Sequence, residues 1–225
     1  MDSSNTNQSA NRKKLEPMAD FFTARLDAYE EHMLRDGDDA YRKLAETVPE
    51  NTKILLDLGC GTGLELDWIF KRFPGISVTG IDITQAMLDK LKQKHPDKKL
   101  KLICGNYFEF EMGKNMYDSV ISSETMHHFS HGEKISLYSR IREALKPGGV
   151  YIEADYMIDD QEEEDETYAE NARARAEQGI PDGEFFHFDT PCTVKNQIAM
   201  LEEAGFSKVE FVFRFKMDVI LLARK

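Results

Sequence analysis

Short apolar runs alternate with amphipathic segments through the middle of the chain. The apolar runs are KILLDL (53–58), SVTGID (77–82), KLKLICG (99–105), YDSVISSE (117–124) and GVYIEADY (149–156). Their length and composition predict strands, and the first run is apolar enough to be buried on both faces of a sheet. Most segments between them repeat apolar residues every three or four positions, which predicts helices. Strands interleaved with helices are typical of a doubly wound parallel sheet.

The N-terminal part has a helical pattern after a polar start. Residues 1–16 contain no apolar core and are expected to form a disordered leader. Apolar residues then recur at helical spacing over 17–35, RDGDD (35–39) predicts a break, and a second short helix is expected over 38–47.

The C-terminal part departs from the alternation. Residues 159–178 predict a helix outside the βαβ pattern, and a further helix is expected near 193–204. Two apolar runs follow, KVEFVFRF (208–215) and MDVILLARK (217–225). Their connection is too short for a parallel crossover, which needs roughly a dozen residues. The last strand is therefore expected to be reversed.

Length and charge limit the class of protein. The 225 residues suit one α/β domain, which we place at 17–225 with a helical insert at 157–205. The net charge of −12 argues against a nucleic acid or an anionic membrane as partner. The lysines between 90 and 101 form a candidate basic patch, and a solvated surface is the simpler interpretation.

Cysteine usage and hydropathy indicate a cytoplasmic protein. Cys60, Cys104 and Cys192 are odd in number and form no C-x-x-C pair, which suits reduced thiols. No apolar stretch approaches the roughly 18 residues that a membrane span needs. The start of the chain lacks the apolar core of a signal peptide. The oligomeric state stays open, and a homodimer is one possibility.

The first predicted strand runs into a glycine-rich loop. Gly59, Gly61 and Gly63 are spaced G-x-G-x-G at a strand-to-helix junction, so backbone can approach a ligand closely. The spacing differs from the G-x-G-x-x-G of dinucleotide sites, and no Gly-Lys-Ser/Thr of a P-loop follows. Asp57 at the strand end would repel a diphosphate and attract an ammonium group. The following helix N-terminus can bind a carboxylate, so an amino-acid group fits this loop.

Asp82 ends the second predicted strand. An acid at this place commonly accepts hydrogen bonds from the two ribose hydroxyls of a nucleotide. The alternative is a helix cap ahead of ITQAM. Together with Asp57, the ribose interpretation indicates a nucleoside that carries an amino-acid tail.

These motifs lead to a family. LLDLGCGTG, VTGID and LKPGG, each in register over about 50–156, resemble the class I S-adenosylmethionine-dependent methyltransferases. The resemblance implies a Rossmann-like seven-stranded sheet, parallel except for the reversed last strand, and S-adenosyl-L-methionine as cofactor. It also implies a transferase that passes a methyl group to an acceptor by in-line displacement.

The resemblance further implies cofactor contacts. Residues 17–48 resemble a helical lid of bacterial relatives, with Arg25 at the cofactor carboxylate; a surface Arg25 and a core Tyr29 are the alternatives. Asn106 stands where the family more often has an acid facing the adenine amino group. The implied cofactor residues are Arg25, Tyr29, Asp57, Gly59, Cys60, Gly61, Thr62, Gly63, Asp82, Ile83, Met87, Asn106, Tyr107, Ser123 and Glu124.

The segment SSETMHHF holds the candidates for catalysis. His127 and His128 can serve as a general base, with Glu124 behind them, or simply form the pocket wall. No metal is expected, because FSHG interrupts the i, i+4 pair of His127 and His131 and no further ligand completes a set. We expect a small-molecule acceptor enclosed by Asp155, Tyr156 and the aromatic residues of 185–188.

Three alternatives remain at this point. The C-terminal half also resembles the carboxy-S-adenosylmethionine synthases of transfer-RNA wobble modification. That family uses an arginine in the insert, and GIPDGEFFHF (179–188) contains none. A non-catalytic cofactor-binding protein would keep the loop and Asp82 but lack an acceptor pocket. A nicotinamide dehydrogenase fits least, because of Asp57 and the glycine spacing.

The acidic run DDQEEEDE (159–166) is either a solvated helix start or part of a selective lid.

Overall fold

The computed structural model describes residues 14–225, apart from the side chains of residues 36 and 37. Most of the expected leader at 1–16 lies outside the described residues. The strands are β1 (Ile54–Leu58), β2 (Ser77–Asp82), β3 (Lys99–Cys104), β4 (Tyr117–Ser123), β5 (Leu145–Ile158), β6 (Cys192–Thr193), β7 (Lys208–Phe215) and β8 (Asp218–Arg224). The helices are α1 (Met18–Thr47), α2 (Leu64–Arg72), α3 (Gln85–Lys94), the short 3₁₀ turn η1 (Met126–His128), α4 (His131–Ala144), α5 (Gln161–Gln178) and α6 (Val194–Glu203).

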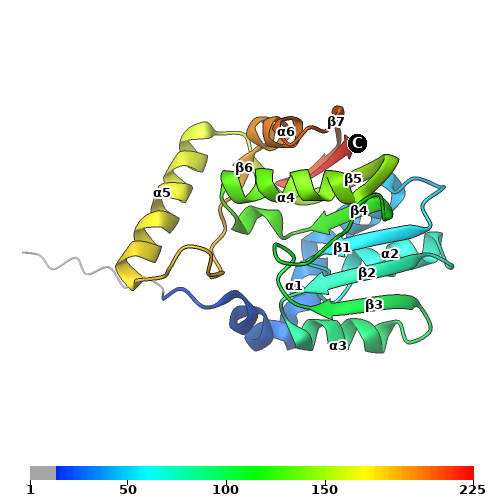
Figure 1. The fold of residues 1–225 in the computed structure, drawn as a ribbon. Helices are drawn as coiled ribbons and strands as arrows, with labels where there is room; N and C mark the ends of the chain where they lie inside the picture. Colours follow the sequence, from blue (N-terminus) through cyan, green and yellow to red (C-terminus); the bar gives the residue numbers. More distant parts are fainter. Residues whose placement is uncertain (1–13) are drawn as a thin grey trace, which may run out of the picture.

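One twisted sheet organises the molecule (Figure 1). Its strand order is β3-β2-β1-β4-β5-β8-β7, and the two-residue β6 pairs with β5 beside this path. Strand β8 runs antiparallel to both β5 and β7, while every other neighbouring pair is parallel. The predicted doubly wound sheet with a reversed last strand is therefore confirmed, with β6 as an addition.

Apolar side chains of the sheet pack into a layer on each face. Along β1, Leu55 joins a cluster with α1, α2 and α3, whereas its neighbour Leu56 joins a cluster with α4 and α6. Both leucines are fully buried. Because successive strand residues point to opposite faces, the continuous apolar run of β1 fits a strand covered on both sides.

Helix α1 is a single helix of 30 residues, so the break predicted at RDGDD is wrong. The C-terminal half of α1 packs on the sheet, with Leu44 and the capping residue Val48 fully buried. This packing outweighs the cost of roughly 1 kcal/mol for a glycine inside a helix. The helix ends at Val48, which is extended because Pro49 follows it.

The insert after β5 begins with the predicted long helix. Helix α5 projects to one side of the sheet, and the chain then returns to β6 and α6 (Figure 1). The Asp160 side chain caps the helix by accepting from the Glu162 N–H at 2.8 Å. Most acids of the run are exposed, as expected of a solvated helix start, but Glu164 is buried and accepts from the Thr193 N–H. None of the described helices is long and apolar enough to cross a membrane.

Candidate functional site

The loop between β1 and α2 holds three glycines in left-handed backbone conformations. Gly59, Gly61 and Gly63 have φ angles of +73°, +46° and +74°. A Cβ atom at Gly59 would lie 2.7 Å from the Thr125 hydroxyl, and one at Gly63 would lie 2.5 Å from a leucine of α3. At Gly61 the nearest side-chain atom to an added Cβ would be the Tyr29 hydroxyl at 3.9 Å, so the loop lies in van der Waals reach of α1. The glycines let the backbone itself form a binding surface.

Two carboxyl groups are buried together beneath this loop. Asp57 at the end of β1 is fully buried, and Glu65 in the first turn of α2 is 5% exposed. Apart from facing each other, Asp57 Oδ1, Asp57 Oδ2 and Glu65 Oε1 have no hydrogen-bond partner among the described residues. Burial and the neighbouring Glu65 raise the pKa of Asp57 well above its usual range, and burial raises the pKa of Glu65 to about 7. Buried acids without a paired cation fit the ammonium group of an amino-acid ligand.

Asp82 ties the glycine loop to the second strand. Its Oδ2 accepts from the Gly61 N–H at 2.9 Å, and its Oδ1 accepts from the Thr84 N–H at 2.7 Å. Burial raises the pKa of Asp82, while these two N–H groups oppose the rise. Each carboxylate oxygen can accept a second hydrogen bond, so support of the helix start at Thr84 and contact with a ribose are compatible.

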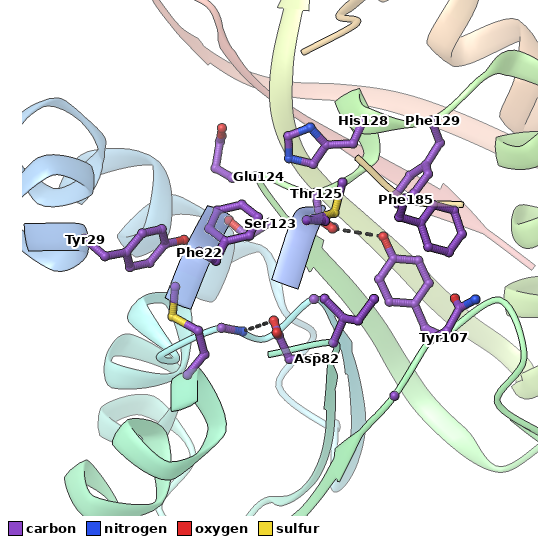
Figure 2. A pocket seen from close by; sticks show the side chains of 17 residues that line it. Phe22, Tyr29, Asp82, Tyr107, Ser123, Glu124, Thr125, His128, Phe129 and Phe185 are labelled. Atoms are coloured by element: carbon purple, nitrogen blue, oxygen red, sulfur yellow. Dashed lines mark hydrogen bonds between the residues drawn. The ribbon is translucent and has the colours of Figure 1, made fainter. Parts of the chain in front are cut away.

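A pocket lies over the loop at the carboxyl ends of the strands (Figure 2). Its wall includes ten predicted cofactor residues: Tyr29, Gly59, Gly61, Asp82, Ile83, Met87, Asn106, Tyr107, Ser123 and Glu124. The predicted catalytic residue His128 lines it as well. The Tyr107 hydroxyl is hydrogen-bonded to the Thr125 hydroxyl at 2.9 Å, which fixes the ring on the pocket wall.

Four further predicted residues lie under the loop and not on the pocket wall. Asp57, Cys60, Thr62 and Gly63 are buried. The Cys60 sulfur packs so closely on β2 that a Cβ atom at Gly80 would lie 2.7 Å from it. Side chains along the strand and the loop point in different directions, and some of them point toward the core. The contiguous motif LDLGCGTG therefore does not present every side chain to a ligand.

Arg25 is turned away from the cofactor pocket. Its guanidinium pairs with Glu16 at 2.9 Å and lies over the Phe21 ring, 3.6 Å from the ring centre. The side chain is 41% exposed and lines a second cavity. These contacts place Arg25 at the surface, which was the alternative interpretation, whereas Tyr29 lies on the cofactor pocket wall.

The pocket is nearly filled by residues that the sequence did not assign to it. These are Met18, Phe22, Gly105, Thr125, Phe129 and Phe185. The remaining volume is about 60 Å³, against roughly 300–1,000 Å³ for ligand pockets in general. The apolar stripe of α1 could have indicated Phe22. Phe185 comes from the distant insert, and no local pattern indicates its place.

A second, larger cavity of about 590 Å³ adjoins this pocket. The two share the wall residues Phe22, Tyr29, Glu124 and His128. The rest of the second cavity combines aromatic and charged side chains, namely Phe21, Arg25, Ala28, His32, Met33, His127, Tyr156, His187, Asp189 and Asp218. An apolar cavity with converging polar groups is the usual form of a small-molecule site.

The acceptor residues expected from the sequence are only partly brought together. Tyr156 and His187 line the second cavity, but Phe185 lines the cofactor pocket. Phe186 and Phe188 line neither cavity, so the expectation that all four aromatic residues enclose an acceptor is wrong. Because the backbone of 185–190 is irregular, neighbouring side chains point in different directions. Their directions cannot be predicted from the aromatic sequence alone.

The two candidate histidines have opposite electrostatic surroundings. His127 Nδ1 lies 2.5 Å from Asp155 Oδ1. Burial alone would lower the pKa of His127, but the Asp155 carboxylate and this hydrogen bond raise it to about 9. Burial and the neighbouring His127 hold the pKa of His128 well below its usual range. Only His128 is therefore neutral near pH 7, and only His128 lines both cavities.

Comparison with known proteins relates the central part of the chain to methyltransferases. A family described as a methyltransferase domain matches residues 55–149. Malonyl-[acyl-carrier protein] O-methyltransferase of Priestia megaterium is 33% identical over 98 residues, which cover 42% of this chain and 34% of that relative. This chain thus spans about a third of the length of that relative. Carboxy-S-adenosyl-L-methionine synthase of Helicobacter hepaticus is 27% identical over 183 residues, covering 76% of each chain.

Solved structures agree with this fold. Human N-acetylserotonin methyltransferase in complex with S-adenosylmethionine superposes with a TM-score of 0.64 at 20% identity, covering 93% of this chain and 60% of that one. The glycine loop, the acid at the end of β2 and the strand order are the features that the sequence resemblance implied. Residues 55–149 are therefore similar to a methyltransferase domain, and the whole chain has the fold of a protein solved in complex with S-adenosylmethionine.

Proposed function

We propose that this chain transfers the methyl group of S-adenosylmethionine to a small molecule held in the second cavity. The observation that carries the proposal is the shared wall between the two cavities. Glu124 and His128 line both of them, so a ligand in either cavity can contact these side chains. A protein that only binds the cofactor needs no second cavity at this place.

The described residues provide a partner for each part of the cofactor. Asp82 would hold the ribose hydroxyls and Asn106 the adenine edge, while Asp57 and Glu65, buried beneath the glycine loop, would attract the ammonium group electrostatically without lining the pocket. When bound, the cofactor supplies an electrophilic methyl group on its sulfonium. The buried carboxyl groups without a paired cation also favour a ligand with net positive charge.

The contribution of the protein to the reaction is orientation and exclusion of water. Correct placement of two reactants can lower a barrier by roughly 7–11 kcal/mol. The aromatic side chains of Phe22 and Tyr29 stand at the wall between the cavities and can set the position of an acceptor. His128 lines this same wall, where a group that removes a proton from an acceptor would have to stand.

Charge in the second cavity supports a neutral or cationic small acceptor. Asp189 and Asp218 line it, and its two cationic side chains, Arg25 and His127, are each paired with a carboxylate, Glu16 and Asp155. Burial and Asp155 raise the pKa of Glu124 to about 8, so repulsion of a phosphate group would come mainly from Asp189 and Asp218. The net charge of −12 points the same way, because nucleic-acid binding generally rests on several contacts from lysine or arginine to phosphates.

The test is a labelling experiment with the full chain. The protein is incubated with S-adenosylmethionine carrying a labelled methyl group, together with either a metabolite extract or bulk transfer RNA. We expect label in small molecules and none in RNA, and the Asp82→Ala variant should transfer little. Label only in RNA would contradict the small-molecule proposal.

A carboxy-S-adenosylmethionine synthase activity is the second candidate. It is supported by the relative from Helicobacter hepaticus, whose match covers most of both chains. Against it, Arg25, which lines the second cavity, is paired with Glu16. Mass spectrometry of the cofactor that copurifies with the protein separates the two, because the carboxylated cofactor is heavier by the mass of carbon dioxide.

A further inference from the structure

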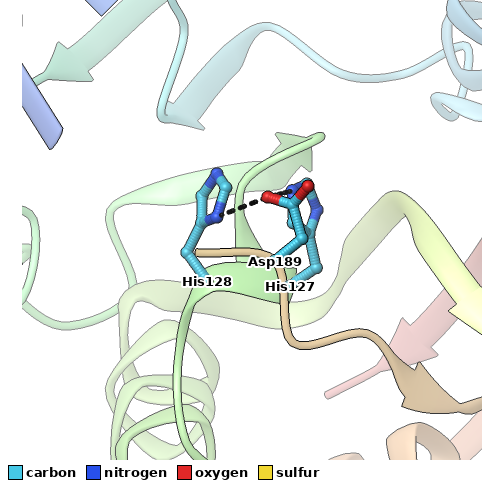
Figure 3. A group of neighbouring side chains, drawn as sticks. All are labelled: His127, His128 and Asp189. Atoms are coloured by element: carbon cyan, nitrogen blue, oxygen red, sulfur yellow. Dashed lines mark ion pairs between the residues drawn. The ribbon is translucent and has the colours of Figure 1, made fainter. Parts of the chain in front are cut away.

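We propose that His127, His128 and Asp189 form a binding site for a divalent transition-metal ion in the second cavity. Figure 3 shows the Asp189 carboxylate beside the imidazole rings of His127 and His128, with ion pairs drawn as dashed lines. One ligand atom from each residue lies within 4.8 Å of the other two. The histidines come from η1 and the aspartate from the returning insert, about 60 positions later, so the fold alone unites them.

The separations fit an ion better than direct hydrogen bonds. Asp189 Oδ1 lies 3.6 Å from His127 Nε2 and 3.4 Å from His128 Nδ1. Ordinary hydrogen bonds to nitrogen are about 2.7–3.2 Å long. Two ligand atoms that are each about 2.1 Å from one tetrahedral ion stand about 3.4 Å apart, which follows from the bond lengths of zinc sites. The cluster therefore has the spacing of a metal site.

Hydrogen bonds outside the cluster hold the first histidine in place. Asp155 Oδ1 binds His127 Nδ1 at 2.5 Å, so Nε2 faces Asp189 and would release its proton when an ion binds. Asp155 Oδ2 accepts from the Met126 and His127 N–H groups at 2.7 and 3.1 Å, so the same carboxylate fixes the backbone of η1. A carboxylate on the far nitrogen of a histidine is the usual outer partner in metal sites.

The aspartate is positioned by its neighbour in sequence. Both the N–H and the hydroxyl of Thr190 donate to the carbonyl of His127, at 2.7 and 2.8 Å. This clamp binds the end of the insert to η1 and sets Asp189 opposite the histidines. His187 Nε2 also lies 3.5 Å from Asp189 Oδ1 and can approach the same ion from the cavity side.

The ligand set indicates the kind of ion. Two imidazoles with one carboxylate suit Zn²⁺ or Fe²⁺, which keep further positions open for water or substrate, whereas Mg²⁺ prefers oxygen ligands. All three residues border the second cavity. This deepens the proposed function: the acceptor would be a small molecule that offers an oxygen ligand to the ion, close to the shared wall.

The sequence had indicated no metal, because only the i, i+4 pair of His127 and His131 was considered. His131 belongs to a different group, in which it pairs with Glu164 at 2.7 Å. The third member, Cys192, is bound by Lys134 at 3.0 Å and by Tyr168 at 3.1 Å. That group is already occupied by internal contacts and serves as the control.

The test measures metal binding without reference to activity. The full chain is stripped with a chelator and titrated with Zn²⁺ and with Co²⁺, whose visible absorption reports tetrahedral coordination. Equilibrium dialysis with elemental analysis gives the stoichiometry. We expect one ion per chain, loss of at least a hundredfold in affinity in Asp189→Asn and His128→Gln, and no change in Cys192→Ser. Asp155→Asn should weaken binding about 10- to 100-fold.

Several outcomes would overturn the assignment. They are absence of stoichiometric binding, unchanged affinity in Asp189→Asn, or loss of binding in Cys192→Ser alone. Asp189 is an exposed residue, so its variant is expected to fold. Calorimetric titration with S-adenosylmethionine on the same samples separates the two proposals. If the protein binds the cofactor but no metal, the metal site is rejected and the proposed function stands. If it binds a metal but no cofactor, the proposed function is rejected and the metal site stands.

Discussion

At the scale of single residues, the Asp57 and Glu65 pair is the feature that most constrains the ligand. Ionising two adjacent buried carboxyl groups is costly, so the free protein retains a proton on the pair. Asp57 could be predicted from its place at the end of the first strand. Glu65 could not, because an acid in the first turn of a helix is usually a solvated residue that suits the helix dipole.

The first prediction concerns the pH dependence of cofactor binding. An ammonium group stabilises the ionised pair, so binding releases a proton when the pH is below the raised pKa of Glu65, about 7. Affinity for S-adenosylmethionine should therefore increase roughly tenfold from pH 6 to pH 8. Glu65→Gln should flatten this dependence, and the exposed control Glu143→Gln should keep it. Calorimetric titrations across this range are the measurement, and a pH-independent affinity in the unmodified chain would contradict the assignment.

The same proton also links pH to folding. The folded-state pKa of Glu65 is raised above its unfolded value, so the folded chain binds more protons than the unfolded chain between these values. The contribution of Glu65 to the free energy of unfolding of the cofactor-free protein should thus be full below about pH 4 and decline as the pH rises to about 7. Urea denaturation of the unmodified chain and Glu65→Gln at several pH values measures the difference. An equal pH dependence in the two proteins would contradict it.

The second residue to test is Asp82. Removing its carboxylate should weaken cofactor binding by about 1.5–3 kcal/mol, the range for hydrogen bonds to a charged group. Asp82 also binds the Gly61 N–H, so Asp82→Asn, which keeps one acceptor oxygen, should lose less than Asp82→Ala. Calorimetry on both variants is the measurement. Unchanged affinity in Asp82→Ala would remove the ribose assignment.

At the scale of elements, α1 lies against the pocket over the glycine loop, and we expect it to close over the cofactor. Its Phe22 and Tyr29 line the small remaining volume, so entry of a nucleoside would require this helix to shift. The N-terminal end is held by the Met18 N–H, which donates to the Phe185 carbonyl at 3.0 Å. Lys94 links Glu30 of α1 to the Thr62 carbonyl of the glycine loop. The second half of α1 is packed on the sheet, so opening would be confined to residues 18–35, and mobile lids generally come from the less stable parts of a structure.

Hydrogen exchange can test this role of α1. Amides of residues 18–35 should exchange at least tenfold more slowly when S-adenosylmethionine is bound, because the cofactor would add contacts to the lid. Helix α4 on the opposite face should show little change and serves as the internal control. Equal exchange of α1 with and without cofactor would reject the lid.

Elements with a clear apolar period were predictable, and junctions were less so. The strands β7 and β8 match their predicted runs because alternation and a short turn fix both their limits and their direction. The length of α1 was wrong because its pattern contains a glycine and acids, while burial of its second half on the sheet decides the outcome. The segment 185–190 has no period, so its contribution to both cavities depends on the tertiary fold.

At the scale of the whole molecule, a buried polar network joins the insert to the sheet. Glu153 of β5 accepts hydrogen bonds from Tyr138 of α4 at 2.8 Å and from Gln197 of α6 at 2.6 Å. Lys134, only 1% exposed, donates to Cys192 and to Gln197 in the same region. The network lies on the face of the sheet opposite α1, so it stabilises the scaffold while α1 remains able to shift.

Removing the buried cation should therefore destabilise the fold. Lys134→Ala leaves the acceptors on Cys192 and Gln197 without their donor, and we expect a loss of about 3–5 kcal/mol in the free energy of unfolding. Lys195→Ala, at an exposed position of the neighbouring helix α6, should change it by less than about 0.5 kcal/mol. Urea denaturation gives both values. A small effect at Lys134 would show that the network contributes little to stability.

The use of one helix as a wall for both cavities has a kinetic consequence. An acceptor held in the second cavity, as proposed, would contact Phe22 and Tyr29 and so oppose the shift of α1 expected for cofactor entry. Steady-state turnover should then follow a compulsory order, with the cofactor first on and its demethylated product last off. The spent cofactor should inhibit competitively against S-adenosylmethionine and noncompetitively against the acceptor. With this order, the rate would follow the ratio of fresh to spent cofactor.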